Sequence, residues 1–259
     1  MLRPRTYQTE AVIIKKTKLG EADRILTLYS LELGKIQGVA KGIRRPRSKL
    51  AGHLELLTYS QVTFARGRNL DTIIGSQTIN SFLPLKSDLD LIAYALYATE
   101  LVNQFTAEHI ENRVLFQLLI ETMQRLSRTA DHQLILRYFE LHLLETSGYR
   151  PQLQECVVCR QPLKPVTNLF SSSAGGILCT ECRRNQELVF PVSVDALKAL
   201  RWLQDNDLET ALRLKIETTL SRELEMTTRN YIKYLLEREV KSVAWLDSLK
   251  GEIQPPASR

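Results

Sequence analysis

The four cysteines of the chain form two hooks of identical spacing, and thiolate sulfur is the most distinctive chemistry that the sequence offers. Cys156 and Cys159 make the first hook, and Cys179 and Cys182 make the second, with 19 residues between the hooks. That spacing is typical of a four-cysteine zinc site. A two-residue spacer lets both sulfurs of a hook turn to one ion, so two hooks fill the corners of a tetrahedron. The sequence therefore predicts one structural Zn²⁺, with no coordination position left open for water or substrate.

Two other interpretations of the same cysteines have less support. Two disulfides would suit a small secreted protein, but no apolar signal core follows the charged start of the chain. A thioredoxin-like redox pair normally has one hook rather than two. Many zinc knuckles have glycine directly after the second cysteine, where a positive φ is convenient. Here Arg160 and Arg183 take those positions, while Gly175 and Gly176 precede the second hook and can supply a tight turn.

The net charge of +6 is concentrated in one short window of the chain. Residues 33–70 contain eight cations against a single carboxylate, Glu55: Lys35, Lys41, Arg44, Arg45, Arg47, Lys49, Arg66 and Arg68. Such a block attracts a polyanion, and nucleic acid is the leading candidate. Residues 41–49 form a predicted basic loop whose cations can contact phosphates, with a steep dependence on salt. The alternative is a solvated loop that only keeps the protein soluble.

The sequence lacks the residue patterns of the common catalytic sites. It contains no Gly-x-x-x-x-Gly-Lys-Ser/Thr phosphate loop, no His-Glu-x-x-His helix and no Gly-x-Ser-x-Gly elbow. The Lys-x-Asp-Gly motif of nucleic-acid ligases is absent too. The histidines are scattered, and His142, inside an apolar helix, is expected to be packed and hydrogen-bonded rather than to act as a general base. We therefore expect a binding protein and not an enzyme.

About eighty residues at the start of the chain have the period of β-strands. Runs of β-branched and aromatic residues at 9–16, 25–31, 35–40, 56–65 and 72–82 alternate with glycine-containing turns. Five short strands predict a small barrel, and their number and length suit an OB-fold, although periodicity alone leaves an SH3-like barrel open. Tyr29, Tyr59 and Phe64 are candidates for stacking on bases. The competing interpretation is that these aromatic residues belong to the barrel core.

Pro84 marks a change to helical periodicity. One apolar stripe runs from Leu89 through Ala93 to Phe105, and a second runs over 115–126. A third helix is expected to be capped by Asp131 and to end near Gly148. Helical spacing resumes after Pro191, and a last helix of about twenty residues is expected to begin near Leu220.

These patterns predict an α+β chain in which a barrel precedes a helical domain with an inserted zinc module. The expected boundaries are an OB-fold domain at 1–82, helical parts at 83–150 and 191–250, a zinc insert at 151–190 and a flexible tail at 251–259. Zinc ligation can supply about 10–16 kcal/mol to a small module that buries little core. No apolar run approaches the length of a membrane span, so we expect a cytoplasmic protein without membrane contact.

The combined pattern resembles the RecO family of recombination mediators over nearly the whole chain. The similarity is carried by four segments: 20–29 (GEADRILTLY), 34–36 (GKI), 39–48 (VAKGIRRPRS) and 147–153 (SGYRPQL), which leads into Cys156. Each segment alone is a weak signal, but their order together with the barrel, the helices and the four cysteines is specific.

The resemblance implies a bacterial DNA repair protein, near the nucleoid, without turnover of its own. Such proteins bind single-stranded and double-stranded DNA and anneal complementary strands. They engage the acidic C-terminal tail of single-stranded-DNA-binding protein (SSB) and cooperate with RecR to place RecA on coated strands. By this carry-over the loop at 41–49 is the expected DNA contact, with Lys35, Arg66 and Arg68 as weaker candidates. The rival interpretations are a transcription or translation accessory factor, and a nucleic-acid enzyme with a dispersed active site.

Overall fold

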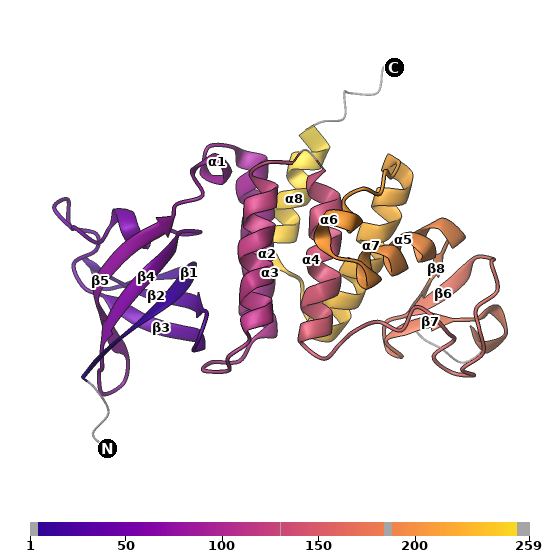
Figure 1. The fold of residues 1–259 in the computed structure, drawn as a ribbon, viewed down its shortest axis with the longest axis horizontal. Coiled ribbons are helices and arrows are strands. Elements are labelled where there is room, and N and C mark those ends of the chain that lie inside the picture. The colour runs from indigo at the N-terminus through magenta and orange to yellow at the C-terminus, as the bar shows by residue number, and fades with distance from the viewer. Residues whose placement is uncertain (1–4, 130, 184–187, 253–259) are drawn as a thin grey trace. The chain divides into compact units, whose positions relative to one another are not determined.

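A computed structural model of the chain describes residues 5–129, 131–183 and 188–252. Within these residues, whose elements Figure 1 labels, contacts divide the chain into two compact units. Unit 1 comprises 5–127 and 242–252, and unit 2 comprises 128–241. This division differs from the boundaries expected above, which follow the type of element rather than contacts and remain a prediction. No helix in the described part of the chain is long and apolar enough to cross a membrane.

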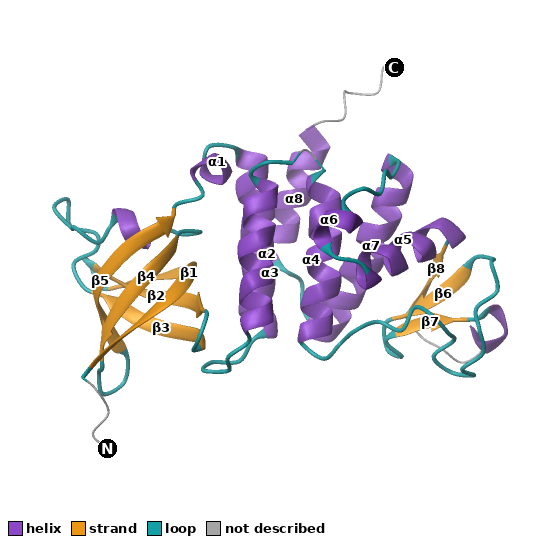
Figure 2. Cartoon of the chain, in the orientation of Figure 1, coloured by secondary structure: helices purple, strands orange, loops and turns teal. Residues whose placement is uncertain are grey.

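Unit 1 begins with a closed barrel of five strands (Figure 2). The strands are β1 (Thr6–Leu19), β2 (Asp23–Ser30), β3 (Gly34–Ala40), β4 (Tyr59–Ala65) and β5 (Asp71–Asn80). Their order around the barrel is β1-β2-β3-β5-β4, and every pairing is antiparallel except that of β3 with β5. This topology is that of an OB-fold, so the fold prediction is confirmed. The predicted strands are confirmed too, although β1 is longer at both ends than the expected 9–16.

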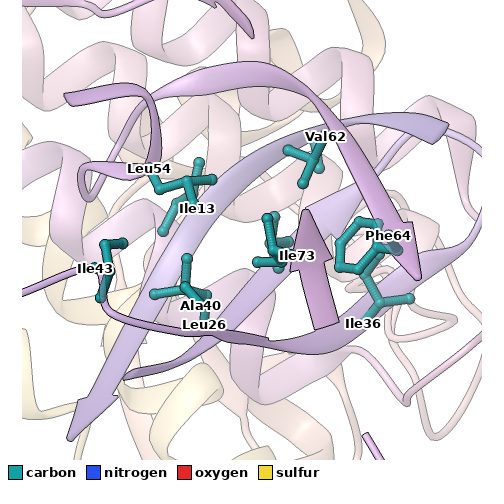
Figure 3. Close-up of a cluster of buried hydrophobic side chains, with 11 residues drawn as sticks. Ile13, Leu26, Ile36, Ala40, Ile43, Leu54, Val62, Phe64 and Ile73 are labelled. Atoms are coloured by element: carbon teal, nitrogen blue, oxygen red, sulfur yellow. The ribbon is translucent and has the colours of Figure 1, made fainter. Parts of the chain in front are cut away.

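Alternate residues of each strand fill the barrel. The interior cluster, most of which Figure 3 labels, consists of Ala11, Ile13, Leu26, Leu28, Ile36, Ala40, Ile43, Leu54, Val62, Phe64 and Ile73. Ile43 and Leu54 come from the long β3–β4 connection, in which a short 3₁₀ helix, η1 (Gly52–Leu54), contacts β5. The side chains between the core positions must point outward, because successive residues of a strand face opposite sides.

The helices of unit 1 are α1 (Leu83–Lys86), α2 (Leu89–Phe105), α3 (Arg113–Leu126) and α8 (Lys241–Glu252). Asp88 and Asn112 cap α2 and α3 by accepting backbone N–H groups of the first turn. The stripe expected from Leu89 was partly wrong, since Ala93 is buried but Leu89 is 68% exposed. The helix expected to be last is followed by α8, whose low amphipathicity gave no periodic signal.

Unit 2 packs four helices with a small sheet: α4 (His132–Thr146), α5 (Val194–Asp205), α6 (Leu208–Ala211), α7 (Thr218–Leu236), β6 (Asn168–Ser171), β7 (Gly176–Leu178) and β8 (Val189–Val192). The sheet order is β7-β6-β8, and it lies in the chain between α4 and α5. Asp131 caps α4 as predicted, accepting from the Leu134 N–H at 3.1 Å. A 3₁₀ turn, η2 (Thr180–Arg183), contains the end of the second hook.

Candidate metal centre and nucleic-acid interface

The folded chain brings all four cysteine sulfurs into one cluster in unit 2. The Sγ atoms of Cys156, Cys159, Cys179 and Cys182 lie within 4.8 Å of one another, and none is in a disulfide. The Cys159 and Cys179 sulfurs are 3.8 Å apart. Zinc–sulfur bonds of about 2.3 Å in a tetrahedron require sulfurs about 3.8 Å apart. The cluster therefore has the size and the ligand set for one tetrahedral ion.

The backbone around the first hook is shaped as a zinc knuckle requires. Arg160, directly after the hook, has φ of 60° and donates its N–H to the Cys156 carbonyl at 2.9 Å. The position that usually carries glycine is thus left-handed here even though it holds arginine. Before the second hook, Gly175 has φ of 70°, and a Cβ at Gly176 would lie 2.4 Å from the Gln152 carbonyl oxygen. The glycine pair therefore makes the turn that the sequence predicted.

The electrostatics of the cluster favour a bound cation. Burial would raise the pKa of the Cys156 thiol, but backbone N–H donors, including that of Cys179 at 3.4 Å, outweigh burial and lower its pKa to about 6. Hydrogen bonds with the neighbouring sulfurs raise the pKa of Cys182 to about 12. Four sulfurs this close cannot all be thiolates without a positive charge between them. Cys156 is itself buried against Leu169 and Leu178, so the cluster also forms the small core of the module.

The basic loop at 41–49 is anchored to the turn between β1 and β2. The Asp23 carboxylate accepts the Gly42 N–H at 2.7 Å, and the Ala22 carbonyl accepts the Arg44 N–H at 3.0 Å. The Arg44 guanidinium donates to the Glu21 carbonyl at 2.7 Å. Gly42 has φ of 63°, which favours glycine at this turn. The loop is therefore held in one shape by its backbone, and Arg44 is one of the residues that holds it.

The other cations of the loop point to solvent. Lys41, Arg45, Arg47 and Lys49 are exposed, and in the described residues no carboxylate forms an ion pair with them. A cation that is not already paired can neutralise a phosphate without first breaking an existing bond. These four side chains are the part of the predicted site that is most available to a polyanion.

The three remaining predicted contacts differ from one another. Lys35 is half-buried, and its ammonium donates to the Asn103 and Thr106 carbonyls at the end of α2. Its positive charge therefore stabilises the C-terminus of that helix. Arg66 lies over the Tyr7 ring, with 4.8 Å between its Cζ and the ring centroid. Arg68 is exposed in the turn between β4 and β5. Arg66 and Arg68 are thus accessible to a ligand, whereas the Lys35 ammonium already binds backbone carbonyls of α2.

The aromatic residues proposed for base stacking are mostly inside the protein. Phe64 is in the barrel core, and Tyr29 is fully buried, with its ring 6.3 Å from that of Phe116. The stacking role was wrong for both. Tyr59 is half-buried, contacts Phe116 edge-on, and donates its hydroxyl to Glu10. The competing interpretation, in which these aromatic residues pack inside the protein, is correct, because a neighbouring strand or helix covers each of them.

Sequence reasoning also missed three cations on the long β1–β2 hairpin. Lys15 and Lys18 are exposed on β1, and Arg24 lies directly opposite Lys18 on β2. Arg24 also pairs with Ala40, the residue before Lys41. Lys18 and Arg24 therefore lie on one face of the hairpin beside the start of the loop, whereas Lys15 points to the other face, and only the strand register reveals this.

His142 has the structural role that was expected of it. Its Nε2 lies 3.0 Å from the Leu203 carbonyl, and its ring packs against Tyr138 at 4.0 Å. Burial lowers its pKa from the ordinary value, with the Leu203 carbonyl opposing the shift. A neutral, packed ring inside unit 2 fits the stabilising role.

Comparisons with known proteins agree with this architecture. The family described as Recombination protein O N terminal matches residues 2–82, and that described as Recombination protein O C terminal matches residues 86–244. A DNA repair protein RecO of Dehalococcoides mccartyi (strain ATCC BAA-2266) is 49% identical, covering 96% of this chain and 98% of its own. Those of Roseiflexus sp. (strain RS-1) and Desulforamulus reducens are 42% and 33% identical, over 99% and 94% of this chain and 91% and 94% of their own.

Proposed function

The chain belongs to the RecO family of DNA repair proteins, and from this premise we propose that it binds single-stranded and double-stranded DNA and anneals complementary strands. We further propose that it does so without catalytic turnover, in the bacterial cytoplasm at the nucleoid. The single observation that carries the proposal is the loop at 41–49, which the barrel anchors while its five cations remain exposed. Two complementary strands repel each other through their phosphates. A surface that neutralises both strands lowers this repulsion and raises their rate of encounter.

Annealing of two labelled complementary oligonucleotides tests the proposal. The wild-type protein is compared with an Arg45→Glu/Arg47→Glu/Lys49→Glu variant, which spares Arg44 because that residue holds the loop in shape. A matched control carries Arg213→Glu/Lys215→Glu/Arg222→Glu, the same change of charge at exposed positions of unit 2. We expect the wild type and the control to accelerate annealing and the loop variant to lose most of the acceleration. No acceleration by the wild type at any salt concentration would favour a plain nucleic-acid-binding accessory factor.

The four cysteines support a second part of the proposal, one structural Zn²⁺ per chain. Four thiolate ligands are the set that structural zinc prefers, and the distances between the sulfurs fit its tetrahedron. When bound, the ion would supply folding free energy rather than catalysis, because no ligand position remains open. Metal analysis of protein purified without chelators should find one zinc per chain. Its absence would contradict the zinc assignment and leave the DNA-binding proposal untouched.

Partners in recombination follow as proposals from the family. We propose that the chain cooperates with RecR and binds the acidic C-terminal tail of SSB, so that RecA can be placed on SSB-coated single strands. A hollow of about 940 Å³ in unit 2 is a candidate for the tail, because Phe190, Tyr234 and Leu235 line it. Its charged lining is mixed: Lys233 and Arg238 lie beside Glu237 and Glu239, and Lys233 pairs with Glu239. Its apolar side chains suit a peptide that ends in a hydrophobic residue. A short acidic peptide should bind at low salt, and Tyr234→Ala should weaken it.

A further inference from the structure

The sulfurs of the cysteine cluster in unit 2 differ in how far they are open to solvent. Cys159 is exposed, whereas Cys156, in the same hook, is fully buried against Leu169 and Leu178. Cys179 and Cys182 of the second hook are intermediate. Susceptibility of a cysteine to oxidation follows the exposure of its sulfur. A small oxidant in solution therefore reaches Cys159 more readily than the buried sulfur beside it.

The exposed sulfur lies next to a sulfur of the other hook. The Sγ atoms of Cys159 and Cys179 are 3.8 Å apart, and a shift of about 2 Å would bring them to bonding distance. The Cys156 sulfur is held in another way, because it accepts the Cys179 N–H at 3.4 Å and belongs to the small core of the module. Cys179 is therefore the neighbour best placed to react with an oxidised Cys159.

We propose that Cys159 and Cys179 form a redox-sensitive pair, which a peroxide converts from two metal ligands into a disulfide that joins the hooks. The inference rests on the proposed zinc site and goes beyond it by assigning a reversible modification to two of its ligands. Zinc, when bound, keeps the sulfurs as thiolates, which are the nucleophilic form of cysteine.

The reaction consumes one hydrogen peroxide and two thiolates. The Cys159 sulfur attacks one oxygen of the peroxide, the O–O bond breaks, and hydroxide leaves as the sulfur becomes a sulfenic acid. The Cys179 thiolate then attacks the Cys159 sulfur, so that the S–S bond forms, the S–O bond breaks and a second hydroxide leaves. The two thiolates supply the two electrons that reduce the peroxide, and two protons convert the hydroxides to water. Cys156 and Cys182 remain as the only thiolate ligands, which is too few for a closed tetrahedral site.

The effect of this modification is expected to stay within unit 2. Cys156 packs against Leu169 on β6 and Leu178 on β7, which are paired directly, so loss of the metal removes support from this small sheet. The loop at 41–49 belongs to unit 1, which contains none of the cysteines. Oxidation should therefore lower the thermal stability of unit 2 and leave the DNA affinity of the protein unchanged.

The test is a disulfide map of the full-length protein, purified with its zinc and treated with hydrogen peroxide. Trypsin cleaves after lysine and arginine but not before proline, so it places the two hooks in separate fragments, 138–160 and 161–183. We expect these fragments to become cross-linked, with tandem mass spectrometry locating the bond between Cys159 and Cys179. Zinc should be released to a chromophoric chelator in step with the cross-link, and dithiothreitol with added zinc should reverse both changes.

A matched pair of variants separates the two sulfurs of interest from the cluster as a whole. Cys159→His and Cys182→His each keep a zinc ligand, because three cysteines and one histidine also form a structural zinc site. Cys182→His should still form the cross-link between the fragments, whereas Cys159→His should not. We expect zinc release by peroxide to be about tenfold slower in Cys159→His than in Cys182→His.

Three results would contradict the inference. One is a disulfide within a single hook of the wild-type protein, and another is a wild-type protein that keeps its thiols and its zinc in excess peroxide. The third is a loss of DNA affinity in step with zinc release, which would show general damage rather than a local modification. Absence of zinc before treatment would instead contradict the proposed metal, and the fragment map would still decide which sulfurs pair.

Discussion

Lys35 belongs to the basic window of the sequence, but its contacts give it a structural role rather than a role in DNA binding. The Lys35→Met substitution tests this structural role. The Lys35 ammonium donates to the Asn103 and Thr106 carbonyls, which are left without helical partners at the end of α2. Hydrogen bonds that involve a charged group contribute about 1.5–3 kcal/mol, and a cation at a helix C-terminus about 0.3–1 kcal/mol. Methionine keeps most of the apolar stem, so we expect a loss of about 2–3 kcal/mol in the free energy of unfolding.

The assay is urea unfolding followed by circular dichroism, with DNA affinity measured on the same preparation below the transition. Lys41→Met is the matched control, because Lys41 is exposed and, in the described residues, has no ion-pair partner. We expect Lys35→Met to lose stability and keep its DNA affinity, and Lys41→Met to keep stability and lose about 0.7 from the salt slope for single strands. If Lys35→Met kept full stability but lowered the salt slope, the structural role assigned to Lys35 would be refuted.

Four further predictions concern other parts of the chain. Cys179→Ser should release the metal and lower the thermal stability of unit 2, and full stability in a metal-free variant would contradict the structural role of zinc. Gly34→Ala should destabilise unit 1 by about 3 kcal/mol, because Gly34 has φ of 63° and a Cβ would lie 1.9 Å from the Ile110 carbonyl oxygen; Gly52→Ala, with open space around it, is the control in thermal melting. Asp23→Ala should weaken DNA binding although it removes a negative charge, because the loop loses its Gly42 anchor; tighter binding would show that the anchor is unimportant. Burial lowers the pKa of His142 in the folded state, so the unfolded state takes up the proton first and stability should fall as the pH drops below about 6.5; in His142→Gln, urea titrations should show a smaller fall on this acid side.

The sequence predicted the elements whose signal is local. The spacing of Cys156 and Cys182 defined the metal cluster, and glycine-bounded β-branched runs defined the five strands. The position of Asp131 as a helix cap was predicted from the preference of aspartate for that position, and the helix after it from the helical spacing of apolar residues. Each of these features depends on residues close together in the chain, so pattern and structure agree.

The features that were missed depend on which segments meet in space. Nothing local distinguishes Lys35, which binds the end of α2, from Lys41, which faces solvent. Phe64 and Ile74 both lie in β-rich runs, and only the strand register, which pairs Phe64 with Ile73 inside the barrel, shows that the aromatic residue is buried and Ile74 is exposed. The helix α8 gave no signal because its apolar residues do not follow a stripe.

The measurement that tests the central claim most directly is the salt dependence of single-strand binding by the wild type and the Arg45→Glu/Arg47→Glu/Lys49→Glu variant. Each phosphate contact contributes about 0.7 to the slope of log K against log salt concentration for single strands. Three lost contacts should therefore reduce the slope by about 2, with weaker binding at low salt and an unchanged melting temperature. An equal slope and equal affinity in the two proteins would contradict the assignment of the DNA contact to the loop at 41–49.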